Sequence, residues 1–297
     1  MRAMNIKLLP FVLLSGVISN FFFSNSSDAV EQAQTDTTKT NAAKTSVVTI
    51  TRYEQLDWTP LNPARGKNSP QAANLWGDRS QTGATGFLVQ FKKGFSSPPH
   101  IHNVTYKGIV LNGEVHNDDP KAASMWMPEG AFWTQPKGES HITAAQANFN
   151  LAYIEIQQGP YLVKPAEHHF DSGERPINVA PQNLVWQPLP TSLGVNSNAE
   201  QALLWGSLKS GETNGRFIKM AGNSELSMVA TKNEIKLVVV ANSVLVNSRH
   251  VHPSFETDVN VGSLIKIKDN KQSGEMVTLQ CTTSIPCVLY ARTQGDF

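Results

Sequence analysis

The sequence predicts an all-β protein made of two tandem barrels. From residue 47 onward, short apolar runs alternate with Gly, Pro, Asn and Asp, whereas long segments with helical spacing are scarce. Several features also recur in order about 129 residues apart. Trp76 is followed by Trp205 at this spacing, and Gly86 by Gly215. Recurrence at a nearly constant offset favours duplication of one β-domain.

The expected strands are rich in β-branched, aliphatic and aromatic residues. Turn-forming residues bound most of them. We interpret as strands residues 47–50, 86–91, 108–111, 151–156, 235–246, 263–268 and 276–280. The close spacing of these runs favours a sandwich or a barrel.

The repeat also predicts where the chain divides. The Leu-Trp-Gly sequence at residues 75–77 returns at residues 204–206, so each copy spans a little under half of the chain. Between the copies lies a polar segment, residues 168–176, that ends in Pro. We predict a first domain over residues 47–165 and a second domain over residues 166–297.

Composition excludes several classes of function. The 297 residues include 25 Lys and Arg and 24 Asp and Glu, a formal net charge of +1. Nucleic-acid-binding proteins normally carry a strongly basic face, so the overall charge offers no reason to expect such a partner. The two cysteines exclude a disulfide-dense scaffold. We therefore expect a small molecule as the ligand.

The N-terminal segment predicts export. Arg2 and Lys7 precede an interrupted apolar stretch, and residues 27–29 form a small-x-small sequence, so residues 1–29 are typical of a cleaved signal peptide. A permanent membrane anchor is the alternative, but the stretch is short for a span. Residues 30–46 are polar and predict a flexible leader. The expected location is periplasmic or secreted, without membrane association after cleavage.

Two histidines begin the candidate site. His100 and His102 alternate at the start of an expected strand, so both side chains lie on one face. Tyr106 has the same parity and would join them on that face. Gly94 and Gly113 bracket this segment and supply turns.

A third histidine follows a predicted turn. Residues 136–138 read Pro-Lys-Gly and would deliver His141 to the start of the next strand. Three neutral imidazoles on facing strands can occupy three corners of a metal's coordination sphere and leave other positions open. The alternative is that the three histidines are buried barrel residues without a metal.

These two segments resemble the two motifs of the cupin superfamily. Tyr106 stands where the first motif usually has Glu, and Ala145 stands where the second ends in Asn. The chain more particularly resembles a bicupin group described as domain of unknown function 4437, and it is similar to cupin domains of anti-sigma factors and of acetylacetone-cleaving dioxygenases. The resemblance implies two double-stranded β-helix (jelly-roll) barrels, the second degenerate. It also implies one divalent transition metal, foremost Fe(II) or Zn, with Mn, Ni or Cu as alternatives.

Tyr106 is the residue that we expect to take part in chemistry beside the metal. A phenol with an ordinary pKa of about 10 favours a hydrogen-bond donor over a phenolate ligand. Trp133 and Gln135 are candidates for contact with a substrate, and ordinary barrel packing explains them equally well.

The second copy lacks the histidines. Met228 and Ala230 occupy the His-x-His positions, and no histidine follows the expected second motif. Glu234 falls near the fourth position, but the offset drifts there and leaves the equivalence open. We predict no metal in the second barrel, which would pack against the first barrel or form a homodimer surface.

The remaining histidines and the cysteines carry weaker signals. His250 and His252 alternate but lack further ligands, His168 and His169 fit a surface linker, and His116 fits the barrel exterior or rim. The cysteines, Cys281 and Cys287, flank a short loop; a disulfide and two free thiols both remain open.

Function follows from the site and stays a hypothesis. The resemblance implies a metal-dependent dioxygenase that oxidatively cleaves a small carbonyl or enol compound. A noncatalytic module that binds or senses a metal or small ligand is the first alternative, and a structural periplasmic cupin is the second. One fold hosts many chemistries, so the sequence leaves open whether the protein is an enzyme.

Overall fold

The computed structural model describes residues 47–190, 198–248 and 255–295. Within them the regular secondary structure is almost entirely strand, and the helices are short 3-10 turns. These turns are η1 (Tyr53–Gln55), η2 (Pro63–Asn68), η3 (Ala166–His168) and η4 (Pro181–Asn183). The predicted signal peptide and leader and the His250–His252 pair lie outside the described residues. None of the described helices has the length and apolar character of a membrane span.

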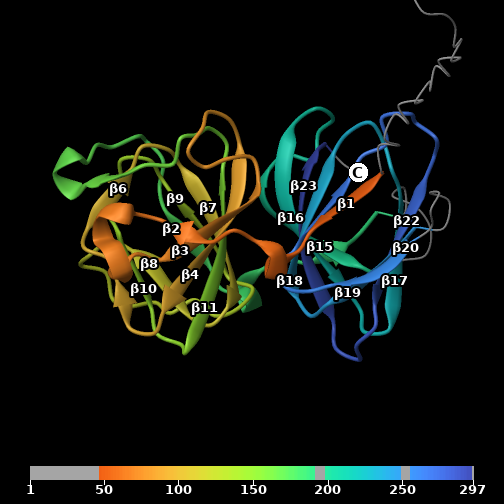
Figure 1. Ribbon diagram of the computed structural model, residues 1–297, viewed down its shortest axis with the longest axis horizontal. Helices are drawn as coiled ribbons and strands as arrows, with labels where there is room; N and C mark the ends of the chain where they lie inside the picture. The colour runs from red at the N-terminus through yellow and green to blue at the C-terminus, as the bar shows by residue number, and fades with distance from the viewer. Residues whose placement is uncertain (1–46, 191–197, 249–254, 296–297) are drawn as a thin grey trace, which may run out of the picture. The chain divides into compact units, whose positions relative to one another are not determined.

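The first barrel contains one large antiparallel sheet and two small ones (Figure 1). The seven strands of the large sheet are, in spatial order, β13 (Ile177–Val179), β9 (Phe132–Gln135), β7 (Tyr106–Asn112), β11 (Phe149–Ile156), β4 (Thr85–Lys92), β3 (Gln71–Trp76) and β2 (Thr59–Pro60). The small sheets are β5 (Phe95–Ser96) with β10 (Ile142–Ala145) and β8 (Val115–Asp118), and β12 (Val163–Pro165) with β6 (His100–His102).

The second barrel repeats this plan. Its seven-stranded sheet has the order β1 (Val48–Thr51), β21 (Leu264–Ile267), β18 (Ile235–Ala241), β23 (Cys287–Gln294), β16 (Thr213–Met220), β15 (Glu200–Gly206) and β14 (Gln187–Pro188). A four-stranded sheet completes it with β17 (Ser224–Val229), β22 (Met276–Cys281), β19 (Val244–Ser248) and β20 (Phe255–Val259). The matching strand orders confirm the two tandem barrels that the repeat predicts.

The edge strands cross the predicted boundary between residues 165 and 166. Strand β1 comes first in the described chain but pairs with β21 of the second sheet, where Val48 lies opposite Ile267. Strand β13 follows the boundary but pairs with β9 of the first sheet. The two pairings are equivalent, because β1 and β13 each lie at the same edge of their own seven-stranded sheet.

Each barrel has its own apolar interior. In the first barrel, aromatic residues such as Phe91 and Trp133 pack with Val110 and Ile154. In the second barrel, the interior is aliphatic and includes Met228 and Ala230, which are 3% exposed each. The second interior is thus filled by side chains at the positions where the sequence lacks histidines.

A third apolar cluster joins the outer faces of the two large sheets. It includes Leu88 and Phe132 from the first sheet and Phe217 and Leu264 from the second. The second barrel therefore packs against the first within this chain, as one of the two alternatives predicted.

Buried polar groups lie within the contact between the sheets. The hydroxyls of Tyr153 and Tyr290 both donate to Oε2 of Glu155, at 2.9 and 2.8 Å, and Arg292 Nε donates to Oε1 at 2.9 Å. Glu155 is only 1% exposed, so these partners compensate for its desolvation.

The repeated sequence features meet at this contact. Trp76 Nε1 donates to the Tyr153 hydroxyl at 3.1 Å, and Trp205 Nε1 donates to the Tyr290 hydroxyl at 3.0 Å. A Cβ at Gly86 would overlap the Trp76 indole, because the strand passes directly beneath the ring. The equivalent glycine in the second sheet meets the equivalent indole in the same way. The repeat therefore marks the contact between sheets rather than the barrel interiors.

The structure defines the state of the two cysteines and the surroundings of His116. Cys281 and Cys287 form a disulfide, so the free-thiol alternative does not apply. The placement of His116 at the exterior or rim needs correction: it faces away from the barrel interior, yet it is only 2% exposed. The segment around Met125 and Trp126 covers it, and the Met125 carbonyl lies 3.1 Å from His116 Nδ1.

Candidate metal centre

Two neighbouring segments of the first barrel bring the three histidines together. Strand β6 carries His100 and His102, and His141 immediately precedes β10. His100 and His141 face each other as an antiparallel pair whose backbone N–H and C=O groups exchange two hydrogen bonds of 3.0 Å. The Pro-x-Gly turn predicted from the sequence lies just before this pair. Gly138 there has a positive φ of 77°, which favours glycine.

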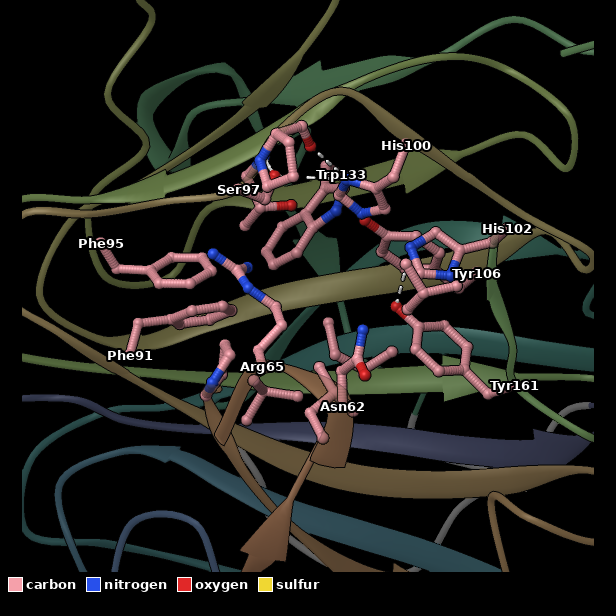
Figure 2. Close-up of a pocket in the computed structure, with 17 residues that line it drawn as sticks. Asn62, Arg65, Phe91, Phe95, Ser97, His100, His102, Tyr106, Trp133 and Tyr161 are labelled. Carbon is pink, nitrogen blue, oxygen red and sulfur yellow. Dashed lines mark hydrogen bonds between the residues drawn. The ribbon is translucent and has the colours of Figure 1, made fainter. Parts of the chain in front are cut away.

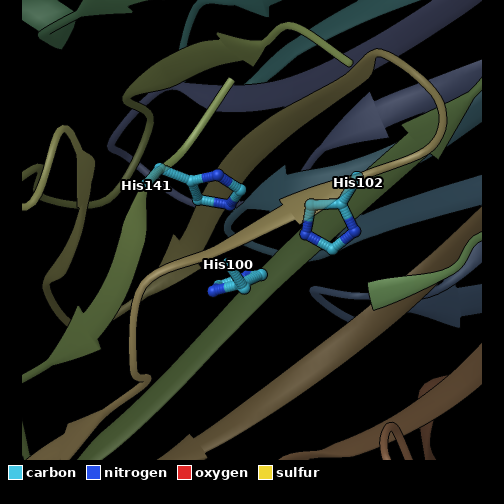
Figure 3. Close-up of side chains that lie close together, drawn as sticks. All are labelled: His100, His102 and His141. Carbon is cyan, nitrogen blue, oxygen red and sulfur yellow. The ribbon is translucent and has the colours of Figure 1, made fainter. Parts of the chain in front are cut away.

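The three imidazoles converge on one place, as Figure 3 shows. Each offers a ring nitrogen, and these atoms all lie within 4.8 Å of one another. The ring centroids are 4.3 Å apart for His100 and His141, 5.0 Å for His100 and His102, and 5.2 Å for His102 and His141. This spacing suits three ligands of one ion.

Hydrogen bonds hold each ring in one orientation. Nδ1 of His100 lies 3.0 Å from the Pro98 carbonyl, Nδ1 of His102 lies 3.2 Å from the Leu162 carbonyl, and Nδ1 of His141 lies 3.1 Å from the Glu139 carbonyl. A carbonyl can only accept, so each Nδ1 carries the proton and donates it. All three Nε2 atoms are therefore unprotonated, which is the form that a metal binds.

Burial keeps these imidazoles neutral. Desolvation lowers the pKa of His102 well below 6.5, with His141 and His100 as smaller contributions of the same sign. Desolvation, and then the charge of His100, lowers the pKa of His141 to about 3. The pKa of His100 is also lowered, mainly by desolvation. Neutral histidines are ready to bind a cation without first losing a proton.

Tyr106 belongs to a buried network beside His141. Its hydroxyl lies 2.9 Å from Asn117 Oδ1, to which it donates, and 3.4 Å from His141 Nε2. Thr143 Oγ1 also donates to Asn117 Oδ1, at 2.8 Å, and Asn117 Nδ2 donates to Gln135 Oε1 at 2.9 Å. Desolvation raises the pKa of Tyr106 far above 10, so the residue is a neutral phenol in this setting.

The two residues that the sequence left open have different surroundings. Gln135 connects Asn117 to the Glu139 carbonyl, to which its Nε2 donates at 3.3 Å, so it supports the network. Trp133 lines the cavity, and its Nε1 makes only a weak contact with the Tyr106 hydroxyl rather than a well-formed hydrogen bond.

Tyr161 is a site residue that sequence reasoning missed. Its ring stacks on His102, with centroids 4.4 Å apart, and its hydroxyl lies 3.2 Å from His102 Nε2. It follows β11 and lies outside both motifs, so no spacing rule points to it. Only the folding of the segment after Pro160 back onto β6 places it there.

Two of the three histidines, His100 and His102, line a cavity of about 100 Å³ (Figure 2). Most of its wall is apolar or aromatic. Its lining comprises Leu61, Asn62, Arg65, Pro70, Val89, Phe91, Phe95, Ser97, Pro98, His100, His102, Tyr106, Trp133, Thr143, Ile154, Tyr161 and Val163. A small apolar pocket with a few convergent polar groups is the usual form of a small-molecule site.

Comparison with known proteins identifies the family. The family model for a domain of unknown function, DUF4437, matches residues 49–297, which include both barrels. The chain belongs to the DUF4437 family. No curated protein matches the sequence.

Solved structures show how this DUF4437 chain relates to other folds. A Nostoc punctiforme protein proposed to be a dioxygenase is 11% identical with a TM-score of 0.60, over 84% of this chain and 83% of that one. Oxalate decarboxylase from Lactobacillus farciminis is 9% identical with a TM-score of 0.53, over 84% and 86%. Hazelnut vicilin (Corylus avellana) is 9% identical with a TM-score of 0.53, over 83% and 85%. These likenesses establish the cupin fold and, at such low identity, the fold alone.

The second barrel of this DUF4437 protein has no comparable cluster among its described residues. Met228, at the first His position, pairs with Val277 across β17 and β22, and both are buried. Val277 offers no ligand atom, and Met228 offers only a single thioether. This place therefore lacks the set of nitrogen ligands found in the first barrel.

Proposed function

We propose that His100, His102 and His141 hold one divalent transition metal through their Nε2 atoms. The single observation that carries this proposal is the set of three Nδ1–H groups donating to backbone carbonyls, since it leaves the Nε2 atoms of three converging imidazoles unprotonated. Burial without a nearby carboxylate also fits, because the neutral imidazoles need no proton release. Fe(II) and Zn are the foremost candidates, and Mn, Ni and Cu remain compatible with imidazole ligands.

We further propose that the centre catalyses oxidative cleavage, of the dioxygenase type, of a small carbonyl or enol compound. When bound, the metal would supply Lewis acidity toward such an oxygen and, if iron, a redox couple for reaction with dioxygen. The likeness in fold to the Nostoc protein supports the reaction class only as an analogy. The aromatic wall formed by residues such as Phe91 and Phe95 would exclude water around the substrate.

Tyr106 is the proposed hydrogen-bond donor to the substrate. Tyr106 lines the cavity, and its hydroxyl lies beside His141 and donates to Asn117 Oδ1. If it turns toward a substrate oxygen, Asn117 Oδ1 keeps the bond from Thr143, so the rearrangement leaves no acceptor unsatisfied. Tyr161 could also donate to a substrate oxygen, because its hydroxyl loses His102 Nε2 as an acceptor once that atom binds a metal.

Metal analysis of untagged protein tests the site. We expect about one metal ion per chain, and its loss in His102→Ala and His141→Ala. His168→Ala should retain it, because His168 is exposed and outside the cluster. Full metal content in both cluster variants would overturn the metal-site proposal.

Oxygen uptake with β-diketones and phenols then tests the reaction. Substrate-dependent uptake by the metal-loaded protein is expected, and Tyr106→Phe should lower kcat by at least about tenfold with unchanged metal content, the effect of losing one positioned donor. Bound metal without uptake across the panel would favour the noncatalytic alternative, in which the centre binds or senses a small ligand.

Export remains part of the proposal. The disulfide between Cys281 and Cys287 supports it, because such bonds persist mainly in oxidising compartments. Mass analysis of the protein recovered from periplasm or medium should give a chain that begins near residue 30, and a chain retained in the cytoplasm with residues 1–29 would contradict export.

A further inference from the structure

One charged side chain lines the cavity that contains the proposed metal centre. Arg65 lies on the cavity wall, where its guanidinium sits against the face of Phe95, 5.2 Å from the ring centroid (Figure 2). Phe91 packs against that ring with a centroid distance of 5.3 Å. This contact holds the guanidinium in place while leaving its N–H groups free to bind another partner.

The segment that carries Arg65 is closed on itself. Leu61 N donates to the Pro70 carbonyl at 2.8 Å, so the two ends of the loop are joined. Inside it, Asn62 Oδ1 accepts from Ala64 N at 3.1 Å and caps η2, while the hydroxyl of the buried Ser69 accepts from Asn62 N at 2.9 Å. The loop is therefore preorganised, and ligand binding does not carry the entropic cost of ordering it.

No carboxylate neutralises this arginine. Among the described residues Arg65 forms no ion pair, and none of the residues that line the cavity is Asp or Glu. If the proposed function is right, a divalent ion held by three neutral imidazoles adds two further positive charges. Such a cavity strongly favours an anion over a neutral molecule of the same shape.

A second donor without a well-formed hydrogen bond lies within the same wall. Trp133 is 1% exposed, and its indole N–H makes only a weak contact, with the Tyr106 hydroxyl. A buried indole N–H usually finds an acceptor, so an oxygen atom of a ligand would satisfy it. Its burial is imposed by the fold, since the ring lies over Gly108, where a Cβ would overlap it.

The size of the cavity limits the ligand. Its volume of about 100 Å³ is below the roughly 300–1,000 Å³ of pockets for drug-sized ligands. Aliphatic side chains, including Val89 and Ile154, form much of the remaining wall. The body of the ligand is accordingly short and apolar.

We propose that the substrate is a small organic anion, such as a short carboxylate, whose charged group is bound by Arg65 while its carbonyl or enol group points toward His100 and His102. Arg65 is then a specificity-determining residue. The proposal rests on the proposed function for the metal, but the binding of the anion to Arg65 does not.

Calorimetric titration with matched probes tests it. Butanoate and butanamide have nearly the same shape and differ in charge, and each is titrated into protein loaded with Zn and into protein freed of metal with a chelator. We expect butanoate to bind at least about tenfold more tightly than butanamide, and Arg65→Gln to remove that preference. Arg65→Lys should restore part of it. Lys67→Ala is the matched control, since Lys67 lies on the same loop, is exposed and does not line the cavity.

The outcomes separate this proposal from the metal site. Equal binding of the two probes, or a butanoate preference that survives in Arg65→Gln, overturns the role of Arg65 even when one Zn ion is bound. Failure to bind Zn, Fe(II) or any of the other candidate metals contradicts the proposed function, while an Arg65-dependent preference in the metal-free protein still supports the anion site. A lowered melting temperature of Arg65→Gln identifies misfolding. The preference of Arg65→Lys for butanoate over butanamide then decides between the outcomes.

Discussion

Acid should destabilise the metal-free protein through His141. Burial lowers the pKa of His141 to about 3, whereas an unfolded chain has a histidine pKa of about 6.5. Below pH 6.5 the unfolded chain binds a proton at this residue and the folded chain does not. The contribution of His141 to the free energy of unfolding is therefore fully present above pH 6.5 and is lost as pH falls toward 3. Between pH 7 and pH 5 the loss works out at about 2 kcal/mol from this residue alone.

The assay is urea unfolding followed by tryptophan fluorescence in the presence of a chelator. Other groups also titrate between these pH values, so the informative quantity is how much the pH dependence changes in His141→Gln. Between pH 7 and pH 5, we expect the free energy of unfolding to fall by about 2 kcal/mol less in this variant than in the wild type. His168→Gln, at an exposed position, should behave like the wild type. An unchanged pH dependence in His141→Gln would refute the claim that this histidine stays neutral when buried.

Two further predictions concern stability. Gly86→Ala should lower the free energy of unfolding by about 2 kcal/mol or more, because the new Cβ overlaps the Trp76 indole at the contact between the sheets; an unchanged melting temperature would contradict this packing. The double variant Cys281→Ser, Cys287→Ser should lose about 2 kcal/mol, the entropy expected for releasing a loop of this short length. Urea unfolding measures it, and equal midpoints for variant and wild type would exclude a stabilising bridge.

The fold could be predicted because its signals are local or repeated. Strand runs, turn residues and the recurring Leu-Trp-Gly each depend on nearby residues, and the two sheets confirm them with one strand order. The exchange of edge strands could not be predicted. β1 is a generic β-branched run, and nothing in its sequence distinguishes the edge of one sheet from the matching edge of the other.

The candidate site likewise contains residues that the sequence predicts and residues that it does not. Alternation along a strand places His100 and His102 on one face, and a Pro-x-Gly turn delivers His141, so their convergence follows from residue order. Tyr161 and Arg65 belong to no motif. They reach the cavity from segments that precede and follow the motifs, through contacts such as the closed loop around η2.

The sequence alone thus determined the class of fold, the duplication and the three histidines, because each is encoded by short-range spacing. Only the tertiary structure decided how the imidazoles are oriented, which side chains complete the cavity and what the repeated tryptophans do. Those properties depend on backbone carbonyls, burial and packing between distant segments. In particular, the repeat that predicts two barrels lies at the buried contact between their sheets, where Glu155 and Arg292 pair across the two copies.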